Sequence, residues 1–461
     1  MLAQRVAEPE DCDAAAPASA APNAPCIYLI NQISGHGHLD MYARLYSKCL
    51  LENGYRVLLL SQHDPGVKQW LTAQSPALAA RFVCLTRDGV AAPPPERAQQ
   101  SPERRAPPGG LRGALGNALR AWRADGLEAV RDLYDAKRHP PLPFGVPFGH
   151  LANEMRMAER HSGWPPAFAL FLYLDMMGQE AESCRDLDAL GVPWAGIRFH
   201  PNGSYREKFR AERYFLGRYA RGAIFLNPQS IPAYRRKFPH LHFASFPDVT
   251  DAATLPAPSP FVTDARRRAS GRKMVLQLGT LSPHKGVFDL IALIKRADPK
   301  RFFFVIAGEV FWSHYGDREQ ELRDFLESPP ENVLVRIGYL EDERELNTLI
   351  EACDCLYAVY KQDFYNSSNT MTKASVFERP VLVSEKFLMG ERVDRYRIGE
   401  VVRPGDVGDA LFWLEEMAAR PHERFGFEAF RRNHSIEALN AALPAALERW
   451  LHGPQKRGFS D

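Results

Sequence analysis

The sequence predicts an α/β protein with two consecutive doubly wound domains, each built on a parallel sheet, that face a central cleft. Its 461 residues are too many for one ordinary hydrophobic core. A hydrophobic fraction of 45% and a charged fraction of 25% are those of a globular protein. In both halves of the chain, short apolar runs alternate with segments of helical apolar spacing. This alternation is typical of βαβ units with parallel strands.

The first domain is expected at residues 25–250, after an Ala/Pro-rich disordered tail at 1–24. A stretch rich in Pro, Arg and Gln at 91–110 indicates an inserted loop within it. Its elements are expected as a strand at 26–30, a glycine loop at 34–38, a helix at 39–53 and strands at 55–60, 167–174, 194–199, 223–226 and 242–246.

The second domain is expected at residues 273–425, after a Pro/Ala/Arg-rich linker at 251–272 and before a helical tail at 426–461. Two doubly wound domains in series place a cleft between the carboxyl ends of their sheets. Strands are expected at 274–278, 302–307, 333–337, 355–359 and 381–384, and helices at 286–296, 318–327, 342–352, 372–377 and 435–451, while the segments 387–399 and 407–418 complete the domain.

Composition and charge exclude several functional classes. A formal net charge of +2 gives no bulk attraction to nucleic acid. Seven cysteines contain no CxxC pair, so neither a zinc site nor a disulfide framework is expected, and a reducing cytoplasm fits best. The N-terminus lacks the apolar core of a signal peptide, and the apolar run at 167–177 is too short to span a bilayer. We therefore expect a cytoplasmic protein, and we interpret His36 and His38 as loop residues rather than metal ligands.

The strongest motif runs from Gly279 to Gly286, where a predicted strand passes through a loop into a helix. Glycine allows a close approach of the backbone, the helix N-terminus attracts anions, and Lys285 adds a full positive charge. This combination suits a diphosphate group. An ordinary β–α turn with an exposed lysine is the alternative.

A second motif is a run of small polar residues at 366–370, between a predicted strand and a predicted helix. Hydroxyls, amides and backbone N–H groups converge there and suit phosphate or sugar hydroxyls. The alternative is a helix cap, although one cap needs only one such residue.

Residues 274–403, with Gly279-Thr-Leu281, Lys285-Gly286, Ile306-Ala-Gly-Glu309, Ile337-Gly-Tyr-Leu340 and the 365–374 loop before Arg379-Pro-Val381, resemble the donor domain of the family 4 glycosyltransferases. These enzymes have the GT-B fold of two Rossmann-like domains. The resemblance implies retaining, metal-independent transfer from a nucleotide-diphosphate sugar to a saccharide or lipid-linked acceptor, with no cofactor. It also implies that Lys285 holds the donor diphosphate.

Three residues depart from the pattern of this family. Thr280 replaces its phosphate-binding arginine, Tyr365 replaces its first glutamate, and Lys373 replaces the second glutamate, which holds the ribose hydroxyls. Lysine cannot accept a hydrogen bond, so the ribose must be held differently. Lys373 is expected to add positive charge near the phosphate, and Asp363 is a candidate for the sugar contact.

The first domain supplies three further candidate groups. A glycine loop at 35–37 follows the first strand, and in similar enzymes such a loop approaches the donor and the acceptor. His200 ends a strand at the cleft, where a purely structural role is equally compatible with the sequence. Asp175 is the best-placed carboxylate for proton handling, with a helix cap as its alternative. The predicted site thus has Lys285, His200 and Asp175 as catalytic residues and Gly35, Gly37, Gly279, Thr280, Lys285, Gly286, Gly308, Glu309, Gly338, Tyr339, Tyr365, Asn366, Ser367, Ser368, Asn369, Thr370 and Lys373 as donor-binding residues, with no metal ligand.

Two basic stretches, at 104–131 and 205–221, leave the contact with membranes open. Either could lie peripherally on the inner face of an anionic membrane, or it could be a solvated helix face. Other functions also stay open: a sugar-nucleotide epimerase or hydrolase of the same fold, or an inactive GT-B module that only binds. A nicotinamide dehydrogenase is disfavoured because the first loop lacks a third glycine.

Overall fold

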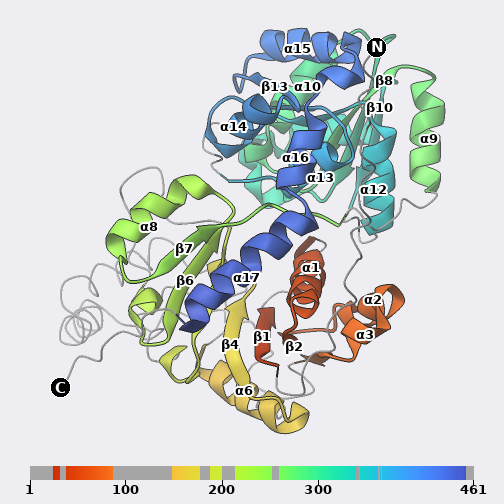
Figure 1. The fold of residues 1–461 in the computed structure, drawn as a ribbon. Coiled ribbons are helices and arrows are strands. Elements are labelled where there is room, and N and C mark those ends of the chain that lie inside the picture. The colour runs from red at the N-terminus through yellow and green to blue at the C-terminus, as the bar shows by residue number, and fades with distance from the viewer. Residues whose placement is uncertain are drawn as a thin grey trace, which may run out of the picture.

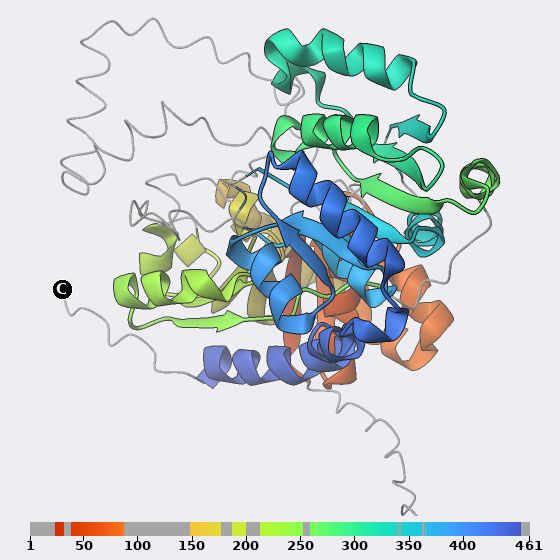
Figure 2. The ribbon, with the colours of Figure 1, turned by 90° about the horizontal axis from the view of Figure 1, so that it is seen from above.

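The computed structural model describes residues 24–31, 38–86, 148–176, 187–199, 213–251, 259–338, 340, 343–361, 364 and 366–452. These residues form two α/β domains, which lie one above the other in Figure 1 and are seen from above in Figure 2. Each domain is built on a parallel sheet, so the predicted fold class is confirmed.

In the first domain the described strands form a seven-stranded parallel sheet of order β3-β2-β1-β4-β5-β6-β7. The chain moves outward in one direction from β1 and in the other from β4, so the topological switch point lies between these two strands. The strands are β1 (Cys26–Asn31), β2 (Arg56–Ser61), β3 (Phe82–Thr86), β4 (Pro166–Phe171), β5 (Trp194–Arg198), β6 (Ala220–Phe225) and β7 (His242–Ser245), and the helices are α1 (His38–Glu52), α2 (Val67–Gln74), α3 (Pro76–Ala79), α6 (Phe148–Ser162) and α8 (Ile231–Lys237).

The second domain holds a six-stranded parallel sheet of order β10-β9-β8-β11-β12-β13. Its switch point lies between β8 and β11. The strands are β8 (Lys273–Leu278), β9 (Phe302–Gly308), β10 (Val333–Ile337), β11 (Cys355–Ala358), β12 (Val381–Ser384) and β13 (Gly399–Val402), and the helices are α9 (Pro260–Ala269), α10 (Val287–Arg296), α11 (Glu319–Glu327), α12 (Glu343–Ala352), α13 (Asn369–Val376), α14 (Phe387–Tyr396), α15 (Val407–Ala419), α16 (Phe427–Asn433) and α17 (Ile436–His452).

The central strands are largely apolar because helices cover both faces of each sheet. In β1, Ile27 and Leu29 belong to one buried core, while Tyr28 and Ile30 belong to the core on the opposite face. This alternation follows from the two-residue period of a strand, which sends successive side chains to opposite faces.

The predicted linker at 251–272 contains a helix. The side chain of Ser259 accepts the N–H of Val262, and Pro260 occupies the first helical position, so α9 begins with a regular start signal. Val262 and Ala265 are buried in the core of the second domain. Part of the stretch expected as a linker therefore belongs to the second domain.

The C-terminal helices divide between the two domains. Phe427 and Phe430 of α16 are buried in the second core, whereas Leu443 and Trp450 of α17 are buried in the first. Figure 1 shows α17 lying along the first domain, beside α1. The Trp450 indole donates to the carbonyl of His242 at 3.1 Å, and its ring stacks on Phe168 with a centroid separation of 5.9 Å. The chain thus crosses between the domains twice.

Several sequence expectations lie outside the described residues: nearly all of the tail at 1–24, the inserted loop at 91–110, the basic stretch at 104–131 and the first part of the stretch at 205–221. In the part of the chain that the structure describes, no helix combines the length and the apolar character needed to cross a bilayer.

Replacement of Trp450 tests the docking of α17. We expect Trp450→Ala to lower the free energy of unfolding of the first domain by about 3–5 kcal/mol, because it removes a fully buried aromatic ring and its hydrogen bond. The measurement is urea unfolding followed by circular dichroism. Phe412→Ala is the matched control, since this ring is 52% exposed. Equal unfolding midpoints for the two variants would contradict the docking.

Candidate functional site

The loops that follow β8 and β11 meet at the switch point of the second sheet. Gly279 ends β8 with a φ of 99°, a left-handed conformation that favours glycine. A Cβ atom built on Gly279 would lie 3.4 Å from Lys285 Nζ and 3.7 Å from Thr370 Oγ1. The ammonium group of Lys285 and the hydroxyl of Thr370 therefore converge on one position at the carboxyl edge of the sheet.

Aromatic rings and a helix cap position this lysine. Lys285 Nζ lies 5.1 Å from the centroid of the Tyr360 ring, within the range of a cation–π interaction. The Tyr360 hydroxyl lies 3.2 Å from Ser368 Oγ, and Ser368 caps α13 by accepting the N–H of Met371. His284 stacks on Phe364 beside it, with the ring planes 5° apart. The lysine is thus held where the N-terminus of α13 presents its positive dipole end.

Among the residues that the structure describes, no carboxylate neutralises the charge of Lys285. Lys285 is half-buried, and its recorded contact is with a ring rather than with an acid, in the part of the chain that the structure describes. Asn369 Nδ2 at the start of α13 is buried and likewise lacks a hydrogen-bond acceptor among the described residues. An anion placed here would meet a cation, an unsatisfied N–H donor and a helix N-terminus.

Two of the predicted glycines, Gly286 and Gly308, allow neighbouring backbone segments to approach closely. A Cβ atom on Gly286 would lie 2.2 Å from the Val359 carbonyl oxygen, and one on Gly308 would lie 1.9 Å from the Gly279 carbonyl oxygen. The Leu281 N–H donates to the Glu309 carbonyl at 2.7 Å, while the side chain of Glu309 is exposed. These positions hold the loops after β8, β9 and β11 together.

Two further predicted residues, Thr280 and Gly338, lie in the loops after β8 and β10. Gly338 has a φ of 128°, and a Cβ atom built on it would meet nothing within 4 Å. Thr280 is half-buried next to Gly279. Of these two positions, Gly338 is thus the one with free space around its Cα among the described residues.

The polar loop before α13 is bonded to a buried carboxylate from the first domain. Asp248 follows β7 and is 1% exposed. Ser367 and Thr372 both donate hydroxyls to it, the latter at 2.8 Å, and Arg392 of α14 lies 3.3 Å away. Tyr42 of α1 donates to its other oxygen at 2.8 Å. One carboxylate thus accepts hydrogen bonds from both domains.

The protonation states in this cluster follow from burial and charge. Burial acts to raise the pKa of Asp248, but the Arg392 guanidinium and the hydroxyls of Ser367 and Thr372 hold that pKa below its usual value. His434 Nδ1 accepts the backbone N–H of Asp248 at 3.2 Å, so its imidazole is neutral there. Burial, and then the positive charge of Arg392, lower the pKa of His434 to about 4.

The structure places Lys373 differently from the expectation that it adds charge beside the phosphate. Its side chain is 2% exposed and its ammonium group contacts Glu343 of α12. It also donates to Asn347 Oδ1 at 3.0 Å. Burial lowers the pKa of Lys373, and the Glu343 carboxylate opposes this shift. A buried cation needs such a partner, because an unpaired charge in the interior is costly.

In the first domain Asp175 anchors the end of β5. Its Oδ2 accepts the N–H of Phe199 at 2.7 Å, and its Oδ1 lies 3.4 Å from the buried Arg198 guanidinium. Asp175 follows β4, at the switch point of the first sheet, and so lies at the edge expected for a site. The other predicted residues, His200, Gly35, Gly37, Tyr339 and Tyr365, and the candidate Asp363 lie outside the described residues.

Sequence reasoning missed the residues that connect the two domains and the partner of Lys373. Asp248 and Arg392 are 144 residues apart, and Tyr42 and Asp248 are 206 apart, so no local spacing relates them. The one local signal was the position of Asp248 after a strand and before the linker. Glu343 gave no signal beyond its place in the first turn of a predicted helix.

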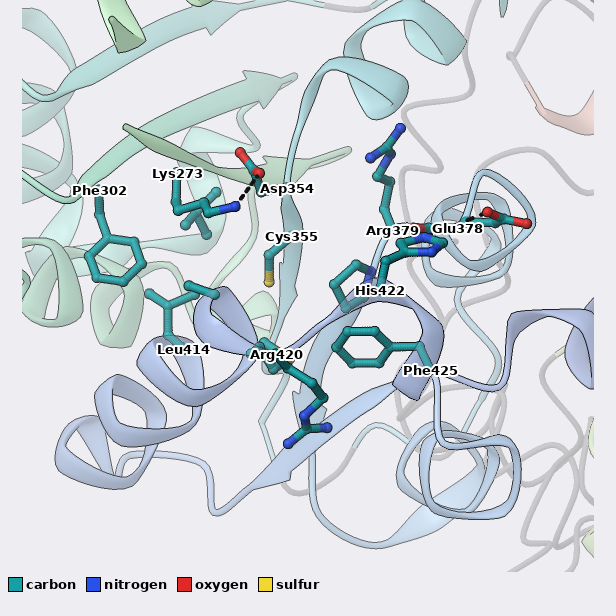
Figure 3. Close-up of a pocket in the computed structure, with 14 residues that line it drawn as sticks. Lys273, Phe302, Asp354, Cys355, Glu378, Arg379, Leu414, Arg420, His422 and Phe425 are labelled. Carbon is teal, nitrogen blue, oxygen red and sulfur yellow. Dashed lines mark hydrogen bonds and ion pairs between the residues drawn. The ribbon is translucent and has the colours of Figure 1, made fainter. Parts of the chain in front are cut away.

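A cavity of about 250 Å³ opens at the opposite, amino-terminal edge of the second sheet. Figure 3 shows the Lys273–Asp354 ion pair on one side of it and His422 with Phe425 on the other. It shares no residue with the cluster around Lys285. Among the described residues, no three His, Cys, Asp or Glu side chains are grouped so that they could hold a metal ion. The sequence contains two Asp-x-Asp triplets, at 11–13 and 186–188. Of their four aspartates the structure describes Asp188, whose carboxylate accepts the N–H of Tyr219 at 3.3 Å.

Solved structures of the same architecture show that the chain has the GT-B fold. Sucrose-phosphate synthase from Thermosynechococcus elongatus matches with a TM-score of 0.57 and 14% identity, over 93% of this chain and 100% of that one. HepE from Anabaena, in complex with UDP-glucose, matches with a TM-score of 0.55 and 12% identity, over 92% and 99%. A glycosyltransferase from Rickettsia africae matches with a TM-score of 0.54 and 11% identity, over 94% and 100%. Neither the models of protein families nor the curated protein sequences give a match.

The Asp248–Arg392 pair makes a prediction about stability. We expect Arg392→Met to lower the free energy of unfolding by about 3–5 kcal/mol, because it leaves a buried carboxylate without its cation. Differential scanning calorimetry measures this loss. Arg395→Met on the same helix removes an exposed arginine and is expected to change little. A melting curve of Arg392→Met that coincides with that of the control would show that the pair stabilises nothing.

His434 makes the unfolding free energy depend on pH. The unfolded chain binds a proton at this residue below its ordinary pKa of 6.5, but the folded chain does so only near 4. The unfolding free energy should therefore fall as the pH is lowered from 6.5 to 4, by roughly 3 kcal/mol at most. Urea unfolding across this range measures the slope. His434→Gln should flatten it, and His422→Gln, at an exposed position, should not. An unchanged slope in His434→Gln would contradict the assignment.

Proposed function

We propose that this chain is a glycosyltransferase that moves a sugar from a nucleotide-diphosphate sugar to a saccharide or lipid-linked acceptor. The observation that carries the proposal is the convergence of the Lys285 ammonium group and the Thr370 hydroxyl beside Gly279. They meet at the switch point of the second sheet, which is where doubly wound domains bind their ligands. The cation is not paired with an acid among the described residues, so a diphosphate is the ligand class that it suits.

The fold supports the same proposal. The structure of HepE that resembles this chain holds UDP-glucose, and other neighbours are a sucrose-phosphate synthase and a glycosyltransferase. A fold hosts many chemistries, so the argument depends on the site rather than on the neighbours. The site adds the cation, the hydroxyl and the helix N-terminus that a departing nucleoside diphosphate requires.

In the proposed reaction, the chain's own groups stabilise the charge that grows on the diphosphate as it leaves the sugar. Lys285 contributes a full charge, fixed over the Tyr360 ring, and α13 contributes its dipole and the N–H donors of its first turn. Thr370 and Asn369 donate from the same helix end. Such fixed donors act most strongly when the cleft closes and water leaves it. Retention of configuration and independence from metal ions belong to the proposal.

On the acceptor side, Asp175 is proposed to position the strand end that leads to His200. Both of its oxygens are engaged, with Arg198 and with the N–H of Phe199. His200 is then the group proposed to meet the transferred sugar or the acceptor hydroxyl, and the engagement of both oxygens makes Asp175 a positioning residue rather than the proton acceptor expected from the sequence. The loop with Gly35 and Gly37 follows β1 at the same switch point.

Lys285→Ala is the variant that tests the proposed catalytic role. Removal of one fixed charge contact is expected to lower turnover about 100-fold or more, with the fold unchanged. Initial rates of nucleoside diphosphate release measure the effect. Lys295→Ala, at an exposed position in the last turn of α10, is the matched control and should keep the wild-type rate. A correctly folded Lys285→Ala protein with near-normal transfer would remove Lys285 from the mechanism.

A thermal-shift screen against a panel of nucleotide sugars identifies the donor, since a ligand that binds only the folded chain raises the melting temperature. Product analysis with and without acceptor then separates the alternatives. Sugar transfer supports the proposal, whereas release or isomerisation of the sugar without acceptor indicates a hydrolase or an epimerase. Calorimetry that detects no binding of UDP, GDP or their sugars would instead indicate an inactive module.

A further inference from the structure

The two oxygens of the Asp248 carboxylate face different domains. Oδ1 accepts the hydroxyl of Tyr42, on α1 of the first domain, at 2.8 Å. Oδ2 accepts the hydroxyls of Ser367 and Thr372 in the second domain, the latter at 2.8 Å. Resting on the proposed function, we propose that Tyr42 and Asp248 are positioning residues of the donor site, through which the first domain holds the loop before α13 in the shape that binds the diphosphate.

The bonds to Asp248 lie on both sides of the hydroxyl assigned to the diphosphate. Ser367 precedes Thr370 and Thr372 follows it, while Thr370 Oγ1 is the atom beside Gly279. Thr372 lies in the first turn of α13, so its bond fixes the end of the helix that presents Thr370. A displacement of α13 relative to the carboxylate therefore moves this hydroxyl relative to the end of β8.

The lysine of the site is connected to the same loop. Ser368, directly after Ser367, caps α13, and its hydroxyl lies 3.2 Å from that of Tyr360. The Lys285 ammonium group in turn lies 5.1 Å from the centroid of the Tyr360 ring. A series of contacts thus leads from Asp248 through the loop to the cation.

Burial makes the bonds to the carboxylate hard to replace. Asp248 and Tyr42 are each 1% exposed. A position without access to water cannot replace a missing donor by a solvent molecule, so the carboxylate depends on its protein partners. Arg392 supports the same arrangement, because it donates to Ser367 and, at 3.1 Å, to the carbonyl of Leu226 in the first domain. The loop before α13 is therefore bonded to the first domain along two routes.

Positioning must be separated from a purely structural role. A buried hydrogen bond that only stabilises the fold lowers the melting temperature and leaves the ligand affinity of the folded chain unchanged. A positioning bond changes that affinity, although Tyr42 lies in the domain opposite the phosphate cluster. Tyr46, one turn along α1, is the matched control: it is fully buried, and its hydroxyl has no hydrogen-bond partner among the described residues.

The experiment is isothermal titration calorimetry at a temperature where every variant is folded, with pyrophosphate, UDP and GDP as probes. We expect Tyr42→Phe to weaken the binding of the probes that the wild type binds by at least about 5-fold, the lower end of the coupling between two sites. Tyr46→Phe removes no hydrogen bond and should keep the wild-type affinity. Lys285→Ala removes the cation itself and should lose pyrophosphate.

Two further comparisons test whether the effect passes through Asp248. In a Ser367→Ala/Thr372→Val background, Tyr42→Phe should no longer change the affinity, because the donor loop has lost its bonds to the carboxylate there. Within the second domain, Thr372→Val should weaken the binding of the probes, whereas Thr372→Ser keeps the hydroxyl and should bind as the wild type does. This second comparison keeps the test decisive if Tyr42→Phe does not fold.

Each outcome decides the inference. Equal affinities of Tyr42→Phe and Tyr46→Phe overturn it and leave the proposed function standing, as do equal affinities of Thr372→Val and Thr372→Ser. An effect of Tyr42→Phe that persists in the Ser367→Ala/Thr372→Val background overturns the route through Asp248. A wild-type chain that binds none of the three probes overturns the proposed function together with this inference.

Discussion

A buried carboxylate, that of Asp248, fixes the relation between the two domains. It lies on the segment that leaves the first sheet, and it accepts hydrogen bonds from α1, from the loop before α13 and from α13 itself, beside the guanidinium of α14. A charge removed from water is tolerated only when its partners replace the lost hydration. Because those partners come from both domains, the carboxylate is satisfied in one mutual arrangement, and His434 holds its backbone in the same place.

The same carboxylate also constrains the proposed donor site. Ser367 and Thr372, which bind Asp248, flank Thr370, which lies beside Gly279 and Lys285. The loop that we propose to supply neutral donors to a phosphate is therefore hydrogen-bonded to the first domain through Asp248. A closure of the cleft that preserved these bonds would rotate the domains about this loop and move the far edges of the sheets more than the phosphate cluster. The second crossing of the chain, into α17, ties the two domains a second time.

Local patterns in the sequence were enough for the fold and for the choice of Lys285 and Gly279, whose role in a donor site stays a prediction. The βαβ alternation predicted both parallel sheets, and Lys285 with Gly279 followed from one strand–loop–helix segment. Contacts between distant segments were not predictable. Asp248 and Arg392 look like ordinary polar residues until the fold brings them together across 144 positions. Ser259 and Pro260 are a regular start signal for α9. The Pro/Ala/Arg-rich composition around them nevertheless led to the prediction of a linker.

The two lysines near the site show why charge alone does not identify a phosphate ligand. Lys373 is buried and forms an ion pair with Glu343, so its charge is compensated within the protein. Lys285 contacts an aromatic ring, which attracts the cation without cancelling it. An approaching anion therefore experiences the field of Lys285, while that of Lys373 is offset by its partner. Lys373 therefore contributes to the packing of α13 against α12, whereas Lys285 keeps a charge that no carboxylate among the described residues offsets.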